Sequence, residues 1–184
     1  FKKVFNLSDV SSEGREFDLL VKDGDRLALG ELTIDVMHTP GHTPACVSYR
    51  IGDAVFVGDT LFMPDYGTAR ADFPGGDART LYRSIQKILA LPPATRVFLC
   101  HDYKAPGREA YKWQTTVNEE RAMNVHLANG VAEDAFVAMR EARDKTLEMP
   151  ALMLPSIQVN IRAGELPAPE DNGVRYLKLP LNAI

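Results

Sequence analysis

Hydrophobic and polar residues alternate along residues 32–38, LTIDVMH, and this period of two predicts a β-strand. Two further apolar stretches, 45–51 and 54–58, lie on either side of a Gly-Asp pair that suits a two-residue turn. They predict a β-hairpin that follows the first strand. A fourth apolar run, RVFLC at 96–100, is short and typical of a buried strand.

A helical period replaces this alternation over residues 78–90 and predicts an amphipathic helix. Asp77 precedes the helix and is suited to an N-cap, and Pro92-Pro93 ends the pattern. The apolar face of the predicted helix is formed by Leu81, Ile85, Ile88 and Leu89.

The remaining segments complete an alternation of strands and helices. Residues 64–77 are rich in Gly, Pro and Asp and predict a long loop. Two later helices are predicted over 115–124 and 132–147, and the tail from Gly164 is rich in Pro and polar residues. The order of strands, helix, strand and helices predicts an α/β layered fold.

Composition narrows the class of protein. The 184 residues, 45% hydrophobic and 25% charged, suit one soluble globular domain. The net charge of −4 gives no electrostatic case for binding nucleic acid. The two cysteines are no disulfide framework and fit a reducing cytoplasm. No apolar run reaches the roughly 18–20 residues of a membrane helix, and the first residues do not read as a signal peptide. We therefore expect a cytoplasmic protein without a membrane partner.

Three residues that can bind a metal follow predicted strands. His42 follows the first strand, Asp59 the third and His101 the fourth. Loops beyond the carboxyl ends of strands commonly build sites on α/β sheets. Imidazole and carboxylate ligands suit Fe(II) or Zn(II). Taken singly, however, each residue has a structural alternative, because such a histidine is commonly hydrogen-bonded and such an aspartate is commonly a cap.

The other histidines and the two cysteines have simpler interpretations. We expect His38 to have a structural role at the strand end and His126 to cap the C-terminus of a helix. Cys46 and Cys100 are expected to be small buried hydrophobic residues rather than catalytic groups.

Several residues are candidates for holding an anionic substrate, because arginine binds carboxylates through paired hydrogen bonds. We expect Lys104 to be solvated surface charge, whereas the loop that carries Arg70 must lie close to Asp59. The candidates are Arg70, Tyr103, Lys104, Asn160 and Arg162.

The motifs HTPGHT, GDTLF and HDY, in this order and spacing, resemble the second half of a metallo-β-lactamase-fold protein. Within that superfamily, DYGTARADFPGGDARTLYRSI, TTVNEERAMN and LPSIQVNIRAG resemble the persulfide dioxygenases, in a bacterial form called β-lactamase-hydrolase-like. These are glutathione-dependent sulfur dioxygenases with one mononuclear iron. The resemblance covers nearly all of the chain.

The resemblance implies an αβ/βα sandwich of which this chain supplies the C-terminal portion. The chain would then be a single partial domain: 1–31 end the first half, 32–163 form the second half and 164–184 are a tail. The superfamily's His-x-His-x-Asp-His motif does not occur here, and residues 1–31 contain no histidine. We expect the amino-terminal part to be missing from this sequence, and the alternative is a degenerate protein without a working metal site.

The resemblance also implies roles for individual residues. His42 and Asp59 would bind one Fe(II) per chain, with a third ligand from the absent motif. His101 would lie in a second shell or at a second metal site. Glutathione persulfide, oxidised with O2 to sulfite and glutathione, would be held by Arg70 and Tyr103, with Asn160 and Arg162 from the carboxy-terminal segment. A homodimer is expected.

Two other functions stay open from the sequence. A two-zinc thioester or lactone hydrolase of the glyoxalase II type would use Asp59 as a bridge and His101 as a true ligand. An inactive fragment with a structural role would need neither residue.

Overall fold

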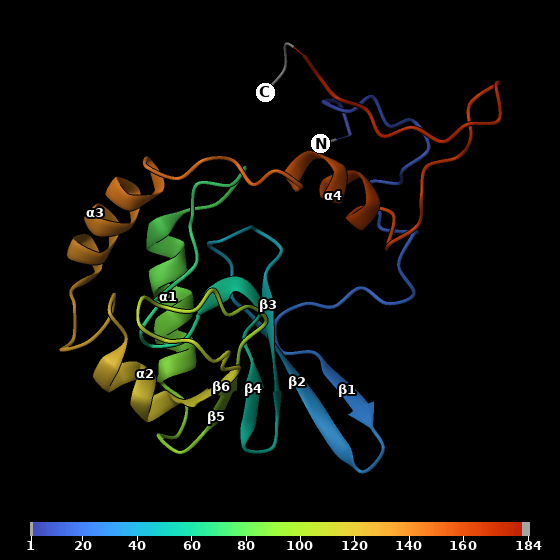
Figure 1. The fold of residues 1–184 in the computed structure, drawn as a ribbon. Coiled ribbons are helices and arrows are strands. Elements are labelled where there is room, and N and C mark those ends of the chain that lie inside the picture. The colour runs from blue at the N-terminus through green and yellow to red at the C-terminus, as the bar shows by residue number, and fades with distance from the viewer. Residues whose placement is uncertain (1, 182–184) are drawn as a thin grey trace. The chain divides into compact units, whose positions relative to one another are not determined.

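The computed structural model describes residues 2–181 of the chain (Figure 1). The chain divides into two compact units, and the larger comprises Val21–Leu147. The smaller joins both ends of the chain, Phe1–Leu20 with Glu148–Ile184. Among the described residues, no helix combines the length and apolar character needed to cross a bilayer.

One mixed sheet forms the frame of the larger unit. Its six strands lie side by side in chain order: β1 (Arg26–Leu29), β2 (Leu32–His38), β3 (Val47–Ile51), β4 (Ala54–Phe56), β5 (Arg96–Phe98) and β6 (Gln114–Thr116). Neighbours are antiparallel except β4 and β5, which run parallel. The strands β2, β4 and β5 therefore point the same way, and their carboxyl ends share one edge of the sheet.

The predicted strands are confirmed, and two others were missed. β2 has the predicted bounds, and β3 and β4 form the predicted hairpin, with Gly52 at a φ of 59° in the turn. The missed strands β1 and β6 are the two edges of the sheet. β6 reads QTT and has no apolar alternation, so only its pairing with β5 makes it a strand.

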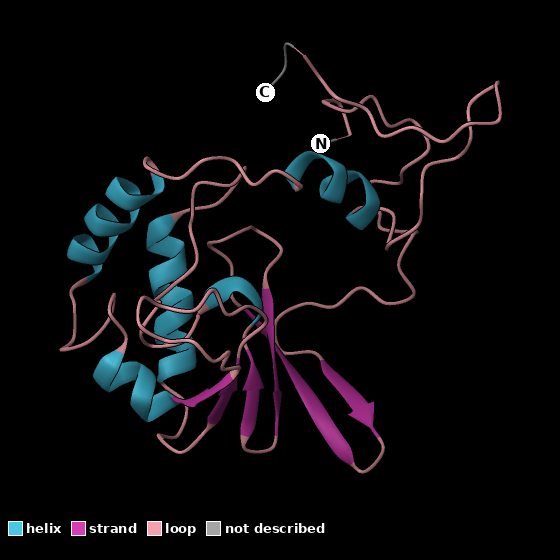
Figure 2. Cartoon of the chain, in the orientation of Figure 1, coloured by secondary structure: helices cyan, strands magenta, loops and turns pink. Residues whose placement is uncertain are grey.

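Three helices gather on one side of the sheet (Figure 2). They are α1 (Ala78–Leu89), α2 (Val117–Met123) and α3 (Glu133–Asp144). The predicted cap of α1 is confirmed, because Asp77 Oδ1 accepts a 2.7 Å hydrogen bond from Thr80 N–H. The predicted face of α1 is buried in one core with Val55 and Val97 of the sheet. α2 begins two residues later and ends one residue earlier than predicted, and α3 begins one residue later and ends three residues earlier.

The predicted loop after β4 is confirmed, and a buried ion pair on α3 fixes it. Arg140 and Asp144 lie 2.6 Å apart, with side chains 1% and 5% exposed. Asp144 Oδ2 accepts a 2.8 Å hydrogen bond from Ala71 N–H, and Arg140 Nη1 donates a 3.2 Å hydrogen bond to the Thr68 carbonyl. The end of α3 thus holds the middle of the loop by its backbone.

His126 also binds this loop, so its predicted role as a helix cap is wrong. The C-cap of α2 is Asn124. His126 Nδ1 instead accepts a 3.0 Å hydrogen bond from Thr68 N–H, across 58 residues of sequence. Burial, helped by the charge of Arg140, lowers the pKa of His126 to about 4, so the ring is a neutral acceptor.

The smaller unit has its own apolar cluster around α4 (Met153–Asn160). Phe5, Leu7 and Val10 are buried there against residues of α4 and its C-terminal end. The sequence pattern did not predict α4, whose first turn contains Pro155 and whose N-cap makes no side-chain hydrogen bond. Packing against the amino-terminal segment stabilises this helix, since its local signals are weak.

Removing one charge of the buried pair tests the anchoring of the loop. Asp144→Asn keeps an acceptor for Ala71 N–H but leaves the Arg140 guanidinium unpaired. We expect it to lower the free energy of unfolding by about 3–5 kcal/mol, measured by urea denaturation. Asp35→Asn, in the exposed pair with Arg26, is the control and should cost less than about 1 kcal/mol. Equal effects would contradict the anchoring role.

A buried carboxyl on α2 predicts a second, pH-dependent effect. Glu120 is fully buried, and burial raises its pKa from 4.5 to about 8. The folded protein therefore keeps a proton that the unfolded chain loses near pH 4.5. Stability from this group is complete below pH 4.5, falls as pH rises, and is lost above about pH 8.

Glu120→Gln should remove this dependence, because glutamine keeps the neutral shape. We expect the variant to be more stable than the parent at pH 9 by a few kcal/mol, since one pKa unit corresponds to about 1.4 kcal/mol. At pH 4 the two should be nearly equal in urea denaturation. An unchanged difference across this range, or the same gain from the exposed Glu141→Gln, would contradict the prediction.

Candidate metal centre

The parallel pairing of β4 and β5 brings three metal-binding side chains together. Asp59 lies in a short 3₁₀ turn directly after β4, and Cys100 and His101 follow β5. Gly58 begins the turn at a φ of 52°, a conformation that favours glycine. Because both strands end at the same edge of the sheet, the side chains that follow them converge.

The donor atoms of these residues meet at one carboxylate oxygen. Asp59 Oδ1 lies 3.3 Å from His101 Nε2 and 3.2 Å from Cys100 Sγ. The three ligand atoms all lie within 4.8 Å of one another. The side chains of Asp59 and His101 are 34% and 52% exposed, so the cluster is open to solvent. A carboxylate, an imidazole and a thiol at this spacing fit a divalent transition metal.

The prediction that Cys100 is a buried hydrophobic residue is wrong. The residue is exposed, and its thiol donates to Asp59. Partial desolvation of the thiol and this hydrogen bond raise the pKa of Cys100 to about 12. Cys46 is partly buried and pairs with the Thr43 hydroxyl at 3.1 Å. β5 ends at Phe98, two residues before the end of the predicted strand, so Cys100 lies in the loop.

His42 is oriented by the backbone of the long loop. Its Nδ1 donates a 2.8 Å hydrogen bond to the Arg70 carbonyl, and its ring packs 4.7 Å from that of Phe73. A carbonyl at Nδ1 fixes the tautomer in which Nε2 is free to bind a metal. His42 does not belong to the cluster of Asp59, Cys100 and His101 among the described residues. Its predicted place as an iron ligand with Asp59 stays a prediction.

Close backbone packing holds the loop that carries His42. Gly41 has a φ of 136°, and a Cβ there would lie 2.3 Å from Leu81 Cα of α1. Only glycine allows this approach. His38, at the end of β2, bonds the Pro44 carbonyl through Nε2 at 2.8 Å. This bond spans the His42 loop and agrees with the structural role expected for His38.

The two predicted glutathione contacts of this unit differ in their surroundings. The Arg70 guanidinium is held by Asp72, with Nε 2.6 Å from Oδ1, and its side chain is 15% exposed. Tyr103 is 54% exposed and stacks on Tyr66 at 5.1 Å. Partial burial raises the pKa of Tyr103, which therefore stays a neutral hydrogen-bond donor at neutral pH. Lys104, expected to be solvated, is half-buried with its Nζ 4.5 Å from the centre of the Tyr111 ring.

An arginine that sequence reasoning missed fixes the loop of His101 and Tyr103. Arg108 Nη2 donates to Asp102 Oδ1 at 2.6 Å, and its Nε donates to Asp65 Oδ2 at 2.7 Å. Arg108 thus joins the loop after β5 to the loop after β4, and it holds the pKa of the Asp102 carboxyl well below its usual range. In the sequence, the signal for this contact was Asp102, a carboxylate between His101 and Tyr103 that calls for a positively charged side chain as its partner.

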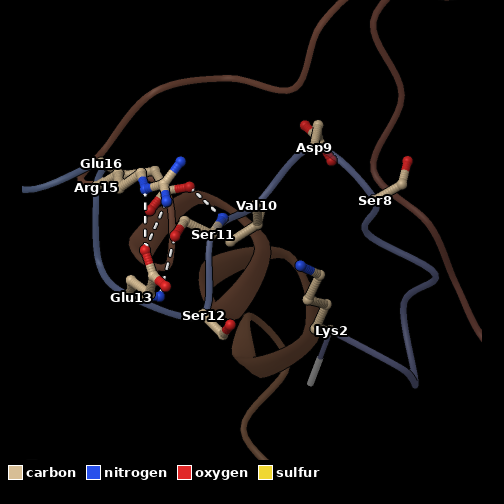
Figure 3. Close-up of a pocket in the computed structure, with 9 residues that line it drawn as sticks. All are labelled: Lys2, Ser8, Asp9, Val10, Ser11, Ser12, Glu13, Arg15 and Glu16. Atoms are coloured by element: carbon tan, nitrogen blue, oxygen red, sulfur yellow. Dashed lines mark hydrogen bonds and ion pairs between the residues drawn. The ribbon is translucent and has the colours of Figure 1, made fainter.

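Asn160 and Arg162 belong to the smaller unit. Arg162 is buried and forms an ion pair with Asp9, Nη2 to Oδ2 at 2.9 Å, while Asn160 is exposed. This unit has a hollow of about 460 Å³, lined mostly by polar residues of the amino-terminal segment (Figure 3). Neither residue lines it, and its Arg15 and Glu13 pair with each other at 2.6 Å. The predicted contacts of Asn160 and Arg162 with glutathione stay predictions.

Comparison with known families gives one clear match. Residues 5–101 match the Metallo-beta-lactamase superfamily. The matched segment contains His42, Asp59 and Cys100 and ends at His101, so it covers all the candidate ligands of the larger unit.

Related proteins carry several names. A probable metallo-hydrolase of Burkholderia pseudomallei is 62% identical over all of this chain, and a glyoxylase B2 of Dictyostelium discoideum is 54% identical over 99% of it. This chain spans 66% and 63% of their lengths. The human mitochondrial persulfide dioxygenase ETHE1 is 37% identical over 62% of this chain and 43% of its own length.

A solved structure has the same architecture. ETHE1 from Myxococcus xanthus superposes with a TM-score of 0.72 at 33% identity, over 86% of this chain and 64% of its own. The likeness therefore extends from sequence motifs to the arrangement of the strands and helices.

The Arg108 contacts predict how the cluster is kept in place. Arg108→Lys keeps the charge but cannot bond both aspartates with a planar fork. We expect faster amide hydrogen exchange in residues 101–108 and about 10–100-fold weaker Zn(II) binding. Arg96→Lys, in the exposed pair with Asp53, is the matched control and should change neither quantity. Unaltered exchange in the loop of the Arg108 variant would refute its positioning role.

Proposed function

The chain belongs to the metallo-β-lactamase superfamily, with the mixed α/β fold that its motifs predict, and we propose that it is a metal-dependent sulfur dioxygenase acting on glutathione persulfide. The observation that carries the proposal is the match to the ETHE1 fold over 86% of the chain, at 33% identity. The human relative named persulfide dioxygenase supports the same activity.

The residues present fit the divalent metal that this fold implies. His42 offers Nε2 because its Nδ1 is taken by the Arg70 carbonyl, and Asp59 offers a half-exposed carboxylate. We propose that both would hold iron. Fe(II) bound there would supply a redox-active centre with open coordination positions for sulfur and O2. His101 also contacts this carboxylate, with Nε2 3.3 Å from Asp59 Oδ1.

The surrounding residues would hold and orient the tripeptide. Tyr103 presents a neutral hydroxyl beside His101, their rings 5.8 Å apart, and would donate a hydrogen bond to a glutathione carboxylate. Arg70 acts first through its backbone, which orients His42. Its guanidinium, held by Asp72, sets the shape of the same loop. Fixing the substrate in one pose lowers the entropic part of the barrier.

The proposed reaction balances without another reductant. Glutathione persulfide, O2 and water give glutathione, sulfite and two protons. The sulfur–sulfur bond breaks, and the outer sulfur loses four electrons to O2. Two oxygens of sulfite come from O2 and the third comes from water.

A hydrolase is the second candidate, favoured by the names of more similar relatives. The Dictyostelium relative is called a glyoxylase and the Burkholderia relative a probable metallo-hydrolase. Asp59 and His101 would then help to hold two zinc ions, which would supply an activated water for attack on a thioester. Two zinc ions per chain and thioester hydrolysis would favour this function, whereas one iron and oxygen uptake favour the dioxygenase.

Oxygen consumption by the full-length, iron-loaded protein tests the proposal. With glutathione persulfide we expect uptake of one O2 per sulfite formed. His42→Asn should lower kcat by more than about 100-fold, because even groups outside the coordination shell contribute about 10–100-fold. His38→Asn is the matched histidine control and should retain most of the activity. No oxygen uptake by the parent protein, or equal losses in both variants, would overturn the proposal.

A further inference from the structure

We propose that Glu120 and Asn124 form a proton-dependent latch on the loop after β4, closed while the Glu120 carboxyl carries a proton and opened when it ionises. We call these two side chains, together with the Gly67 carbonyl that they hold, the Glu-Asn latch. None of the candidate metal ligands belongs to it, and it does not depend on the reaction proposed above.

One buried amide joins α2 to the loop. Glu120 and Asn124 are both 0% exposed and lie four residues apart, in α2 and at its C-cap. Asn124 Nδ2 donates two hydrogen bonds, at 2.6 Å to Glu120 Oε2 and at 3.2 Å to the Gly67 carbonyl. Asn124 Oδ1 accepts a 2.9 Å hydrogen bond from His126 N–H, which fixes the direction of the amide. The carboxyl and the loop therefore share one donor group.

The loop packs directly against this part of the structure. Gly67 has a φ of 103°, and a Cβ there would lie 2.2 Å from His126 Nδ1. The same ring nitrogen accepts a 3.0 Å hydrogen bond from Thr68 N–H. Two residues further on, the Arg70 carbonyl accepts the hydrogen bond from His42. Opening the latch therefore loosens the segment that orients His42.

The second oxygen of the Glu120 carboxyl is the reason that a proton is needed. Oε1 is buried and has no hydrogen-bond partner in the part of the chain that the structure describes. A buried carboxylate without a cation or a full set of donors is costly, and the neutral acid avoids most of that cost. Burial, with smaller help from the carboxylates of Glu119 and Asp65, raises the pKa of Glu120 to about 8.

The charged groups on the neighbouring elements are engaged with other partners. Arg121 of α2 bonds the Leu89 carbonyl of α1, Lys112 acts on Glu119, and Arg143 of α3 acts on His126. The paired cations are Arg108 with Asp65, Arg140 with Asp144, Arg79 with Asp134, Arg83 with Glu133 and Lys87 with Asp23. Since none of these cations pairs with Glu120, an ionised Glu120 has to be hydrated by water.

Ionisation opens the latch in two ways. Water drawn to the new charge separates α2 from the loop, and the charged carboxylate competes with the Gly67 carbonyl for Asn124 Nδ2 because it is the stronger acceptor. Asp144 continues to hold Ala71 N–H, so we expect the opening to be confined to residues 66–70. In the open loop the pKa of Glu120 returns towards 4.5, so opening releases a proton. The latch is therefore strongest below pH 4.5, weakens as pH rises and adds no hold above about pH 8.

Amide hydrogen exchange of residues 66–70 in the full-length protein tests the latch, once corrected for the intrinsic effect of pH on exchange. Glu120→Gln keeps a neutral acceptor for Asn124 but has no proton to lose. Between pH 6 and pH 8, protection of the loop in the parent should fall about 50-fold relative to Glu120→Gln. His126 titrates in both proteins and cancels in this comparison. Glu141→Gln, at an exposed position of α3, is the matched control and should behave as the parent does.

Residues 81–89 of α1 show whether the loop opens separately from the rest of the fold. We expect them to stay more protected than the loop at every pH. A loop that exchanges only together with α1 would overturn the proposal, because it would then open only when the whole unit unfolds. So would a change of less than about threefold in the parent relative to Glu120→Gln, or a response of Glu141→Gln that differs from that of the parent.

A measurement on the unmutated protein keeps the proposal testable even if Glu120→Gln folds poorly. Infrared spectra of protein labelled with ¹³C-glutamate should show the absorption of a protonated glutamic acid at pH 6.5, where exposed glutamates are ionised, and lose it by pH 10. Absence of this absorption at pH 6.5 would overturn the latch. Neither experiment uses oxygen, persulfide or a metal, so failure here is distinguishable from failure of the proposed dioxygenase.

Discussion

The buried ion pair between Arg140 and Asp144 is the interaction on which the long loop of this chain depends. Two charges removed from water are stable only when each is paired and hydrogen-bonded. Here both side chains also bond to the backbone of the loop: Asp144 accepts from Ala71 N–H, and Arg140 donates to the Thr68 carbonyl. The Arg70 carbonyl, which belongs to the same peptide unit as Ala71 N–H, accepts a hydrogen bond from His42 Nδ1–H. A helix far along the chain thereby fixes the orientation of a candidate metal ligand.

Strand direction is the second constraint. β2, β4 and β5 end at one edge, so His42, Asp59 and His101 follow strands that point the same way. This arrangement was predictable, because apolar alternation locates buried strands and the candidate ligands follow them directly. The edge strands β1 and β6 were not, because their pairing is tertiary and their residues carry little pattern. The helix α4 was not predicted for the same reason, since it depends on packing with Phe5 and Leu7.

The candidate site was predictable in its residue types and less so in its partners. His42 and Asp59 stand out because imidazole and carboxylate have known metal chemistry, but Cys100 looked like one more apolar residue of a strand. Its exposure follows from where β5 ends, at Phe98, which apolar character alone does not show. The role of Arg108 was not predicted for another reason, because its two aspartate partners lie 43 and 6 residues away in the sequence. Contacts at such separations come from the fold and not from local sequence.

The central claim is that loops after β4 and β5 build a metal centre on Asp59. Crystals of the protein soaked with Zn(II), with anomalous diffraction collected at the zinc absorption edge, test it most directly. The claim predicts a strong anomalous peak bonded to an Asp59 oxygen and within bonding distance of His101 Nε2. A map in which zinc binds only elsewhere on the chain, leaving Asp59 in contact with Cys100 and His101 alone, would contradict it.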